Sequence, residues 1–167
     1  MANLSIHPLI KSCLFLSCTS GDDGGGCGIY YSQSSLLYAV DSCRCIKCKG
    51  IASPNNEGGG MCLSGNDNFI SCTNCLLYAC EAPSNAGGIF LDCNYATNEK
   101  KITFCFFTEN KSDGAIDVCV WRQSQNFVPL SHCFTTSTGK TVGEYENTKD
   151  HSDWLPHGYI IFLFIYG

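Results

Sequence analysis

Charged side chains are scarce in this chain of 167 residues. Asp, Glu, Lys and Arg make up 15% of it, against about a quarter of an average soluble protein. The formal net charge is −5. The basic residues are dispersed, apart from Arg44, Lys47 and Lys49 and the pair Lys100 and Lys101. Because nucleic-acid binding needs a concentrated basic face, we expect no nucleic-acid partner.

Long apolar runs are also missing. Residues 158–167 form the most apolar stretch, but it offers about eight apolar residues where a spanning helix needs about 20, so we expect no transmembrane span. Residues 1–12 lack the charged start and long apolar stretch of a secretory signal. The compartment therefore stays unknown. A cell-surface or extracellular place would fit if the chain is a fragment of a longer protein.

The chain has no recognisable helical or catalytic motif. No segment repeats apolar residues at helical spacing between two caps. A serine nucleophile elbow, a phosphate-binding glycine loop and a His-Glu-x-x-His pair are all absent. We therefore assign no catalytic, cofactor-binding or metal-ligating residue, and we expect no cofactor.

What the chain does have is a segment that recurs with a cysteine at the same place. Its copies start about 30 residues apart, a period typical of repeat architectures. They are residues 13–18, 43–48, 75–80 and 105–110, with a degenerate copy from Cys133.

Two further elements keep step with this segment. A glycine followed by an apolar run occupies residues 25–30, 59–63, 87–91 and 113–118. A short apolar stretch then precedes the next cysteine, at residues 36–40, 68–71, 101–104 and 127–130. Short β-branched and aromatic runs bounded by Gly, Asn, Ser and Asp indicate strands.

Three strands per unit cannot bury an apolar face alone, but units stacked at about 4.8 Å could share one core. The sequence thus predicts an all-β fold, a parallel β-helix (solenoid) of about four to five coils. Residues 1–138 would hold the repeats. Residues 139–167 would supply a long polar loop and a terminal apolar strand that completes or caps the last coil.

A resemblance to a known family rests on these motifs. The pairing of a Gly-Gly-apolar strand with Phe-x-x-Asn, as in Phe107-Thr-Glu-Asn110, resembles the repeats of bacterial polymorphic outer-membrane proteins and of cysteine-rich protist surface proteins. Equivalent segments here end in Cys18, Cys48 and Cys80 instead of Asn. The resemblance covers about residues 10–138 and implies a right-handed β-helix used in adhesion. Asn110 also fits a glycosylation pattern, but we expect it to satisfy a turn instead.

Cysteine accounts for 14 of the 167 residues. This share is above the roughly 8% at which a disulfide or metal framework is expected. We favour a buried column of free thiols, since cysteine suits a tight interior bend. Disulfides between stacked cysteines remain an alternative. So does a zinc site. Its candidate ligands are Cys43, Cys45, Cys48, Cys72 and Cys75.

Two functional hypotheses follow. The first is a non-catalytic structural or surface-interaction module that binds glycans or a protein surface through outward residues such as Arg44, Tyr78 and Thr108. Such a module could also self-associate through the edge of its C-terminal coil. The alternative is a polysaccharide lyase or hydrolase, for which the candidates are Asp92, Asp117 and Arg122.

Overall fold

The computed structural model describes residues 9–21, 28–32, 38–51, 58–64, 70–92, 100–114, 116–121, 130–137 and 142–144. Within these residues every regular element is a β-strand, and every strand pair is parallel. The all-β class predicted from the repeats is therefore confirmed. No helix long and apolar enough to cross a membrane occurs in this part of the chain.

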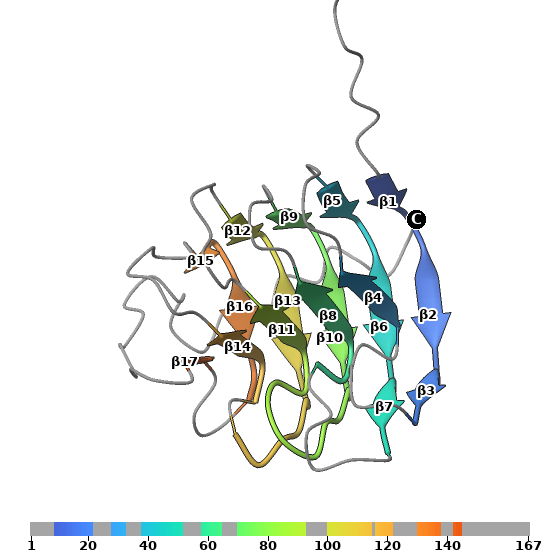
Figure 1. Ribbon diagram of the computed structural model, residues 1–167. Coiled ribbons are helices and arrows are strands. Elements are labelled where there is room, and N and C mark those ends of the chain that lie inside the picture. The colour runs from blue at the N-terminus through green and yellow to red at the C-terminus, as the bar shows by residue number, and fades with distance from the viewer. Residues whose placement is uncertain are drawn as a thin grey trace, which may run out of the picture.

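The strands form three five-stranded parallel sheets and a small fourth one (Figure 1). The first sheet contains β1 (Leu9–Lys11), β5 (Tyr38–Asp41), β9 (Ile70–Thr73), β12 (Lys100–Thr103) and β15 (Leu130–Ser131). The second contains β2 (Leu14–Leu16), β6 (Arg44–Ile46), β10 (Leu76–Tyr78), β13 (Phe106–Thr108) and β16 (Phe134–Thr135). The third contains β4 (Ile29–Ser32), β8 (Met61–Ser64), β11 (Ile89–Asp92), β14 (Val118–Trp121) and β17 (Val142–Glu144). The fourth pairs β3 (Thr19–Ser20) with β7 (Lys49–Gly50).

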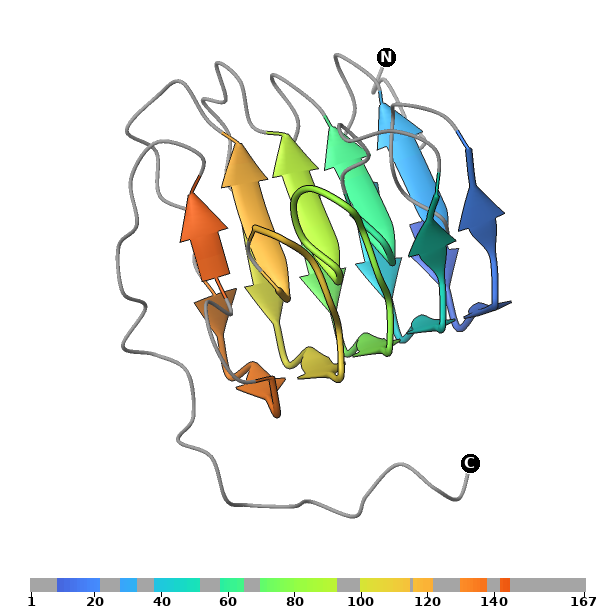
Figure 2. The same ribbon diagram turned by 90° about the horizontal axis from the view of Figure 1, so that it is seen from below.

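Each strand pairs with its counterpart in the next repeat unit. In the second sheet, for example, Cys45 of β6 is level with Phe15 and with Leu77. Figure 2 shows the strands of successive units side by side in chain order, from blue to orange-red. The repeat period is therefore the period of strand pairing.

Most predicted strands overlap a strand of the structure. However, β17 lies within the predicted long polar loop, and the stretch predicted at residues 127–130 shares only Leu130 with β15. The expected strand over residues 113–118 is wrong, because β14 begins only at Val118. Gly114 instead lies in the preceding bend, where its N–H donates to Ser84 O at 2.8 Å. The predicted terminal strand at residues 158–167 lies outside the described residues.

The core contains buried residues from all three sheets together with the bend cysteines. Strand residues alternate between the interior and the outside, so Leu77 is fully buried while its neighbour Leu76 is half-buried. The buried cluster contains aliphatic side chains, Phe107 and many cysteines. The interior side of each strand is thus apolar in nearly every unit.

The Gly-Gly pairs of the sequence mark places where two backbones come close. A Cβ on Gly88 would lie 2.4 Å from the carbonyl oxygen of Asp117, and one on Gly60 would lie 2.9 Å from that of Gly88. Real Cβ atoms do not approach oxygen so closely, so glycine is required at both positions.

Tight bends join the first sheet to the second. The residue before each bend cysteine has a left-handed backbone, with φ 54° at Ser12, 55° at Ser42 and 54° at Asn74. This conformation costs a non-glycine residue about 1–2 kcal/mol. The bend is held by bonds between units: Ser42 N donates to Thr73 O at 3.0 Å, and Asn74 N donates to Thr103 O at 3.1 Å.

Replacing Ala79 with glycine tests the same backbone strain in the bend that follows β10 of the second sheet. Ala79 precedes Cys80 with φ 52°, so Ala79→Gly should relieve the left-handed penalty and leave stability unchanged or raised by up to about 1 kcal/mol. The matched control is Ala39→Gly in β5, where φ is not positive and glycine should destabilise by about 0.5–1 kcal/mol. Urea denaturation measures the free energy of unfolding of both variants. An equal loss of stability in the two variants would contradict the left-handed backbone at Ala79.

The strand phase can be tested on two adjacent leucines. Leu77→Ala should lower the free energy of unfolding by about 2–5 kcal/mol, because Leu77 is fully buried. Leu76→Ala, one residue earlier on the outward side of β10, should cost clearly less. A reversed order would mean that the strand is displaced by one residue and that its faces are exchanged.

Candidate functional site

The bend cysteines form two columns. One column precedes the strands of the second sheet, and the other follows them. The first column contains Cys13, Cys43, Cys75, Cys105 and Cys133. The second contains Cys18, Cys48, Cys80 and Asn110. The backbone links successive members indirectly: Arg44 N, just after Cys43, donates to Cys13 O, and Leu76 N, just after Cys75, donates to Cys43 O, both at 2.9 Å.

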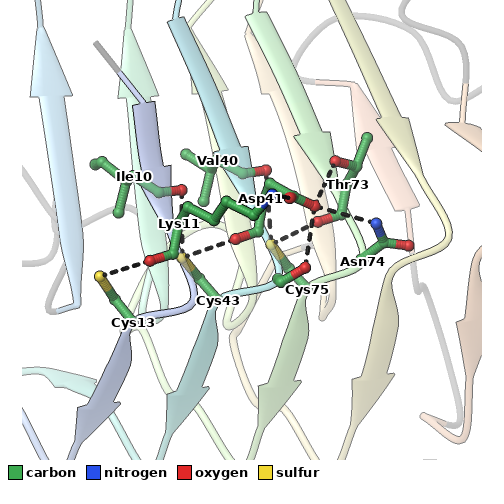
Figure 3. A network of polar contacts seen from close by, with 10 residues as sticks. Ile10, Lys11, Cys13, Val40, Asp41, Cys43, Thr73, Asn74 and Cys75 are labelled. Atoms are coloured by element: carbon green, nitrogen blue, oxygen red, sulfur yellow. Dashed lines mark hydrogen bonds and ion pairs between the residues drawn. The ribbon is translucent and has the colours of Figure 1, made fainter.

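The thiols of the first column bond to backbone carbonyls (Figure 3). Cys43 Sγ lies 3.4 Å from Asp41 O, two residues earlier, and 3.5 Å from Ile10 O in the preceding unit. Cys75 Sγ makes the same two contacts, with Thr73 O at 3.2 Å and Val40 O at 3.8 Å. The thiols of Cys43 and Cys75 therefore each have one acceptor within reach in their own bend and one in the unit before it.

Asn110 fills the corresponding place in the second column. Its Nδ2 donates to Leu77 O of the preceding unit at 3.1 Å, and its Oδ1 accepts from Cys80 N at 3.0 Å. Cys80 Sγ bonds Cys45 O, one unit earlier, at 3.3 Å. Asn110 is only 5% exposed, so the prediction that it satisfies a turn is confirmed. Cysteine and asparagine act here as equivalent donors.

All eleven cysteines whose side chains the structure describes are free thiols. The expected column of buried thiols is thus observed from Cys43 onward, while Cys13 and Cys18 at the start are only half-buried. Burial raises the pKa of Cys43 to about 11. Such a thiol is protonated at neutral pH and can donate to the carbonyls around it.

Three thiols converge at one point in the core. Cys72 belongs to β9, and Cys75 and Cys105 are adjacent members of the first column. Their sulfur atoms all lie within 4.8 Å of one another, with 3.9 Å between Cys72 and Cys105. We call these three residues the thiol cluster.

This set differs from the ligands weighed for zinc. Of those five cysteines only Cys72 and Cys75 belong to the thiol cluster, and Cys105 joins them from the next unit. The sequence spacing indicated ligands that are close along the chain, whereas in the structure Cys72 and Cys75 contact Cys105 of the next unit.

The pKa values within the thiol cluster diverge. Burial raises the pKa of Cys105 well above its ordinary value. Hydrogen bonds from Cys105 and then from Cys72 lower the pKa of Cys75.

A second buried constellation surrounds Asp117. Its Oδ1 accepts from Asn110 Nδ2 at 2.9 Å and from Ser137 Oγ at 2.8 Å, and its Oδ2 accepts from Thr135 Oγ1 at 2.5 Å. The Asp117 residue is fully buried, and its three partners are at most 6% exposed. Burial raises the pKa of Asp117, while the bonds from Thr135, Asn110 and Ser137 oppose that rise.

The sequence did contain a signal for this network. Thr135 takes the interior position that Phe107 and Leu77 occupy in earlier units. Asp117 takes the position of Gly88, because Ile89 N donates to Asp117 O just as Met61 N donates to Gly88 O. Two polar residues thus break the repeat in the same region.

The structure does not bring Asp92 and Asp117 into equivalent places. Asp92 is level with Ser64 and Trp121, not with Asp117. Asp117 is not part of a strand, because β14 begins at Val118 and Asp117 precedes it. Arg122 lies outside the described residues. Asp117 is enclosed by its donors and presents no carboxylate to a substrate in this conformation.

A cleft of about 550 Å³ lies beside the network. Asn110 and Ser137 line it, as do Glu81, Glu109 and Lys111. Glu81 pairs with Lys49 at 2.9 Å. The charged side chains that line the cleft are therefore of both signs.

The outward side of the second sheet carries two columns of side chains, which we call the second-sheet face. The first column contains Leu14, Arg44, Leu76, Phe106 and Phe134. The second contains Leu16, Ile46, Tyr78, Thr108 and Thr136. Tyr78 and Thr108 therefore align as expected, but Arg44 belongs to the neighbouring column.

No family model matches this chain, and no curated protein or solved structure matches it either.

A pH titration of stability tests the burial of Asp117. A raised pKa means that protonation favours the folded state. The stability of the wild type relative to Asp117→Asn should then be greatest below pH 3.8, the ordinary value, and should fall as the pH rises through the folded pKa. Denaturant unfolding at a series of pH values measures the difference.

Asp41→Asn serves as the control of opposite sign. Hydrogen bonding from Asn74 lowers the pKa of Asp41, so the advantage of that carboxylate should be present above pH 3.8 and lost as the pH falls. If the stability contribution of Asp117 were also lost as the pH falls, as expected for Asp41, the burial of Asp117 would be contradicted.

Proposed function

We propose that the chain is a right-handed parallel β-helix that serves as a non-catalytic, adhesin-like interaction module and binds a polysaccharide on the second-sheet face. The observation that carries the proposal is the alignment of outward side chains in two continuous columns across five paired strands.

The β-helix is supported by how the strands pair. Every sheet of five takes one strand from each successive unit, in chain order. A chain that moves from sheet to sheet and returns one strand further on each time describes a helical path. Crossover connections between parallel strands are right-handed in about 98% of cases, which supports the hand.

The resemblance to polymorphic outer-membrane repeats gains support from Asn110. Asn110 and Cys80 each bond a backbone carbonyl one unit earlier, Leu77 O and Cys45 O. A chain with cysteine at this place can therefore build the same bend as one with asparagine. The Gly-Gly pair is likewise explained by the close backbone contact at Gly88.

The second-sheet face suits a polysaccharide because its two columns differ in chemistry. In the units that follow β6, the first column is apolar, with Leu76, Phe106 and Phe134. The second column offers hydroxyl groups from Tyr78, Thr108 and Thr136, and Thr136 Oγ1 lies 2.6 Å from Thr108 Oγ1. A sugar polymer also repeats apolar ring faces beside hydroxyl groups, so columns that repeat at each strand can match it along their length.

The aromatic side chains on this face are ordered before any ligand binds. Phe106 and Phe134 stack with ring centroids 4.5 Å apart. Hydrogen bonding to Glu109 raises the pKa of Tyr78. Side chains that are already held lose little conformational entropy on binding.

Binding to polysaccharides tests the proposal. The probes are cellulose, chitin, xylan and pectin, and binding isotherms give the affinity for each. The double variant Phe106→Ser with Tyr78→Ser should weaken the best interaction about tenfold or more, equivalent to about 1.4 kcal/mol. The matched control is Lys101→Ala with Thr103→Ala, on half-buried positions of β12 in the first sheet, and it should bind as the wild type does.

Three outcomes would count against the proposal. Equal binding by the face variant and the control would place the ligand elsewhere. Absence of binding to all four polymers would exclude a polysaccharide partner of these classes. Release of new reducing ends or unsaturated products would favour the alternative of a carbohydrate-active enzyme, and Asp92→Ala would then be the first variant to assay.

A further inference from the structure

The thiol cluster exists because one residue departs from the repeat. In the first sheet Cys72 is level with Val40 on one side and with Ile102 on the other, and all three are fully buried. A branched aliphatic side chain is thus the usual occupant of this interior position. Cysteine replaces it in the unit where two column cysteines, Cys75 and Cys105, lie within reach.

This departure distinguishes the thiol cluster from the columns. A column repeats along the whole stack, whereas a metal site is a single place. In the described part of the chain, no other three His, Cys, Asp or Glu side chains converge as closely as these three. The cluster is therefore local, as a binding site must be.

We propose that Cys72, Cys75 and Cys105 bind one copper(I) ion in three-coordinate geometry. Thiolates are soft ligands that select copper(I) and zinc over hard cations. Zinc in proteins takes four ligands. No fourth His, Cys, Asp or Glu joins the three among the described residues.

The distances fit a trigonal site. With metal–sulfur bonds of about 2.3 Å, three sulfur atoms in a plane around one ion lie about 4.0 Å apart. The sulfur atoms of Cys72 and Cys105 are already 3.9 Å apart, and all three lie within 4.8 Å. Small changes of side-chain torsion are enough to close the triangle.

The sulfur atoms are also held in place. Cys72 lies within a strand paired on both sides. Cys75 and Cys105 sit at bends fixed by backbone bonds to the next unit, from Asn74 N to Thr103 O and from Phe104 N to Ser131 O, both at 3.1 Å. All three side chains are at most 2% exposed, so the bound ion would be shielded from water and oxidants.

Binding exchanges protons for the metal. Each thiol that becomes a ligand releases one proton to solvent, and the ion arrives and stays as copper(I), so no electron is transferred. The affinity for copper(I) should therefore rise with pH.

The test is an anaerobic titration of the reduced full-length chain with copper(I), using bicinchoninate as the competing chelator. We expect a first equivalent that resists the competitor. Cys72→Val should lose this equivalent, with its affinity lowered about tenfold or more. Valine is the residue found at Val40, the paired position in β5, so this variant should keep its fold and stability.

Two further variants complete the design. Cys105→Ala should lose the same equivalent. Cys43→Ala, from the same column but outside the thiol cluster, should keep it. X-ray absorption at the copper edge should show three sulfur neighbours in the wild type.

The proposal would be overturned if Cys72→Val kept the wild-type affinity, or if the copper had only two sulfur neighbours. A parallel titration with zinc gives a third check. Zinc bound more tightly than copper(I), with four sulfur neighbours, would also overturn it. None of these outcomes depends on whether the second-sheet face binds a polysaccharide.

Discussion

The rest of this structure depends on the bend between the first and second sheets. At each bend the chain enters a left-handed conformation that no glycine relieves, as at Ser42 and Asn74. The next residue is a cysteine whose thiol bonds carbonyls of its own unit and of the one before, as Cys43 does with Asp41 and Ile10. Backbone bonds to the following unit hold the same bend from the other side. Each unit can thus keep a strained turn only because its neighbours are present. The bonds between units stabilise the bends, and the bends in turn place the strands where they can pair.

This dependence explains the choice of cysteine. The bend interior needs a small side chain that tolerates burial and can donate a weak hydrogen bond. Asparagine meets the same need at Asn110, with two stronger bonds to Cys80 N and Leu77 O. Once Asn110 is in place its amide can also reach Asp117, and Thr135 and Ser137 complete a polar cluster within an otherwise apolar core. Such a cluster is tolerated because every group in it has a partner.

The two proposed sites use different residues of the same units: the second-sheet face lies on β10 and β13, whereas Cys72 lies in β9 and Cys75 and Cys105 lie in the bends before β10 and β13. Outward side chains of the second sheet form the columns of the second-sheet face, and inward ones line the core. The thiol cluster lies in that core and joins two consecutive units through Cys75 and Cys105. A metal ion held there would bridge the units that present Tyr78 and Thr108 on the outside. Surface and interior could then be substituted independently, because the two sites use different residues.

The repeat, most of the strands and the burial of the bend cysteines could be predicted from the amino-acid sequence. These features recur with constant offsets, and alternation along a strand assigns the inward side, so local patterns are sufficient to find them. Which side chains contact one another across units depends on the three-dimensional arrangement of the strands. Cys72 contacts Cys105 across a unit boundary, a relation that the spacing from Cys43 to Cys75 does not reveal. Asp117 was a candidate carboxylate together with Asp92, but β14 begins at Val118 and Asp117 is buried in the place of a glycine. Both outcomes depend on the register between units, which short-range sequence patterns determine only to within a few residues.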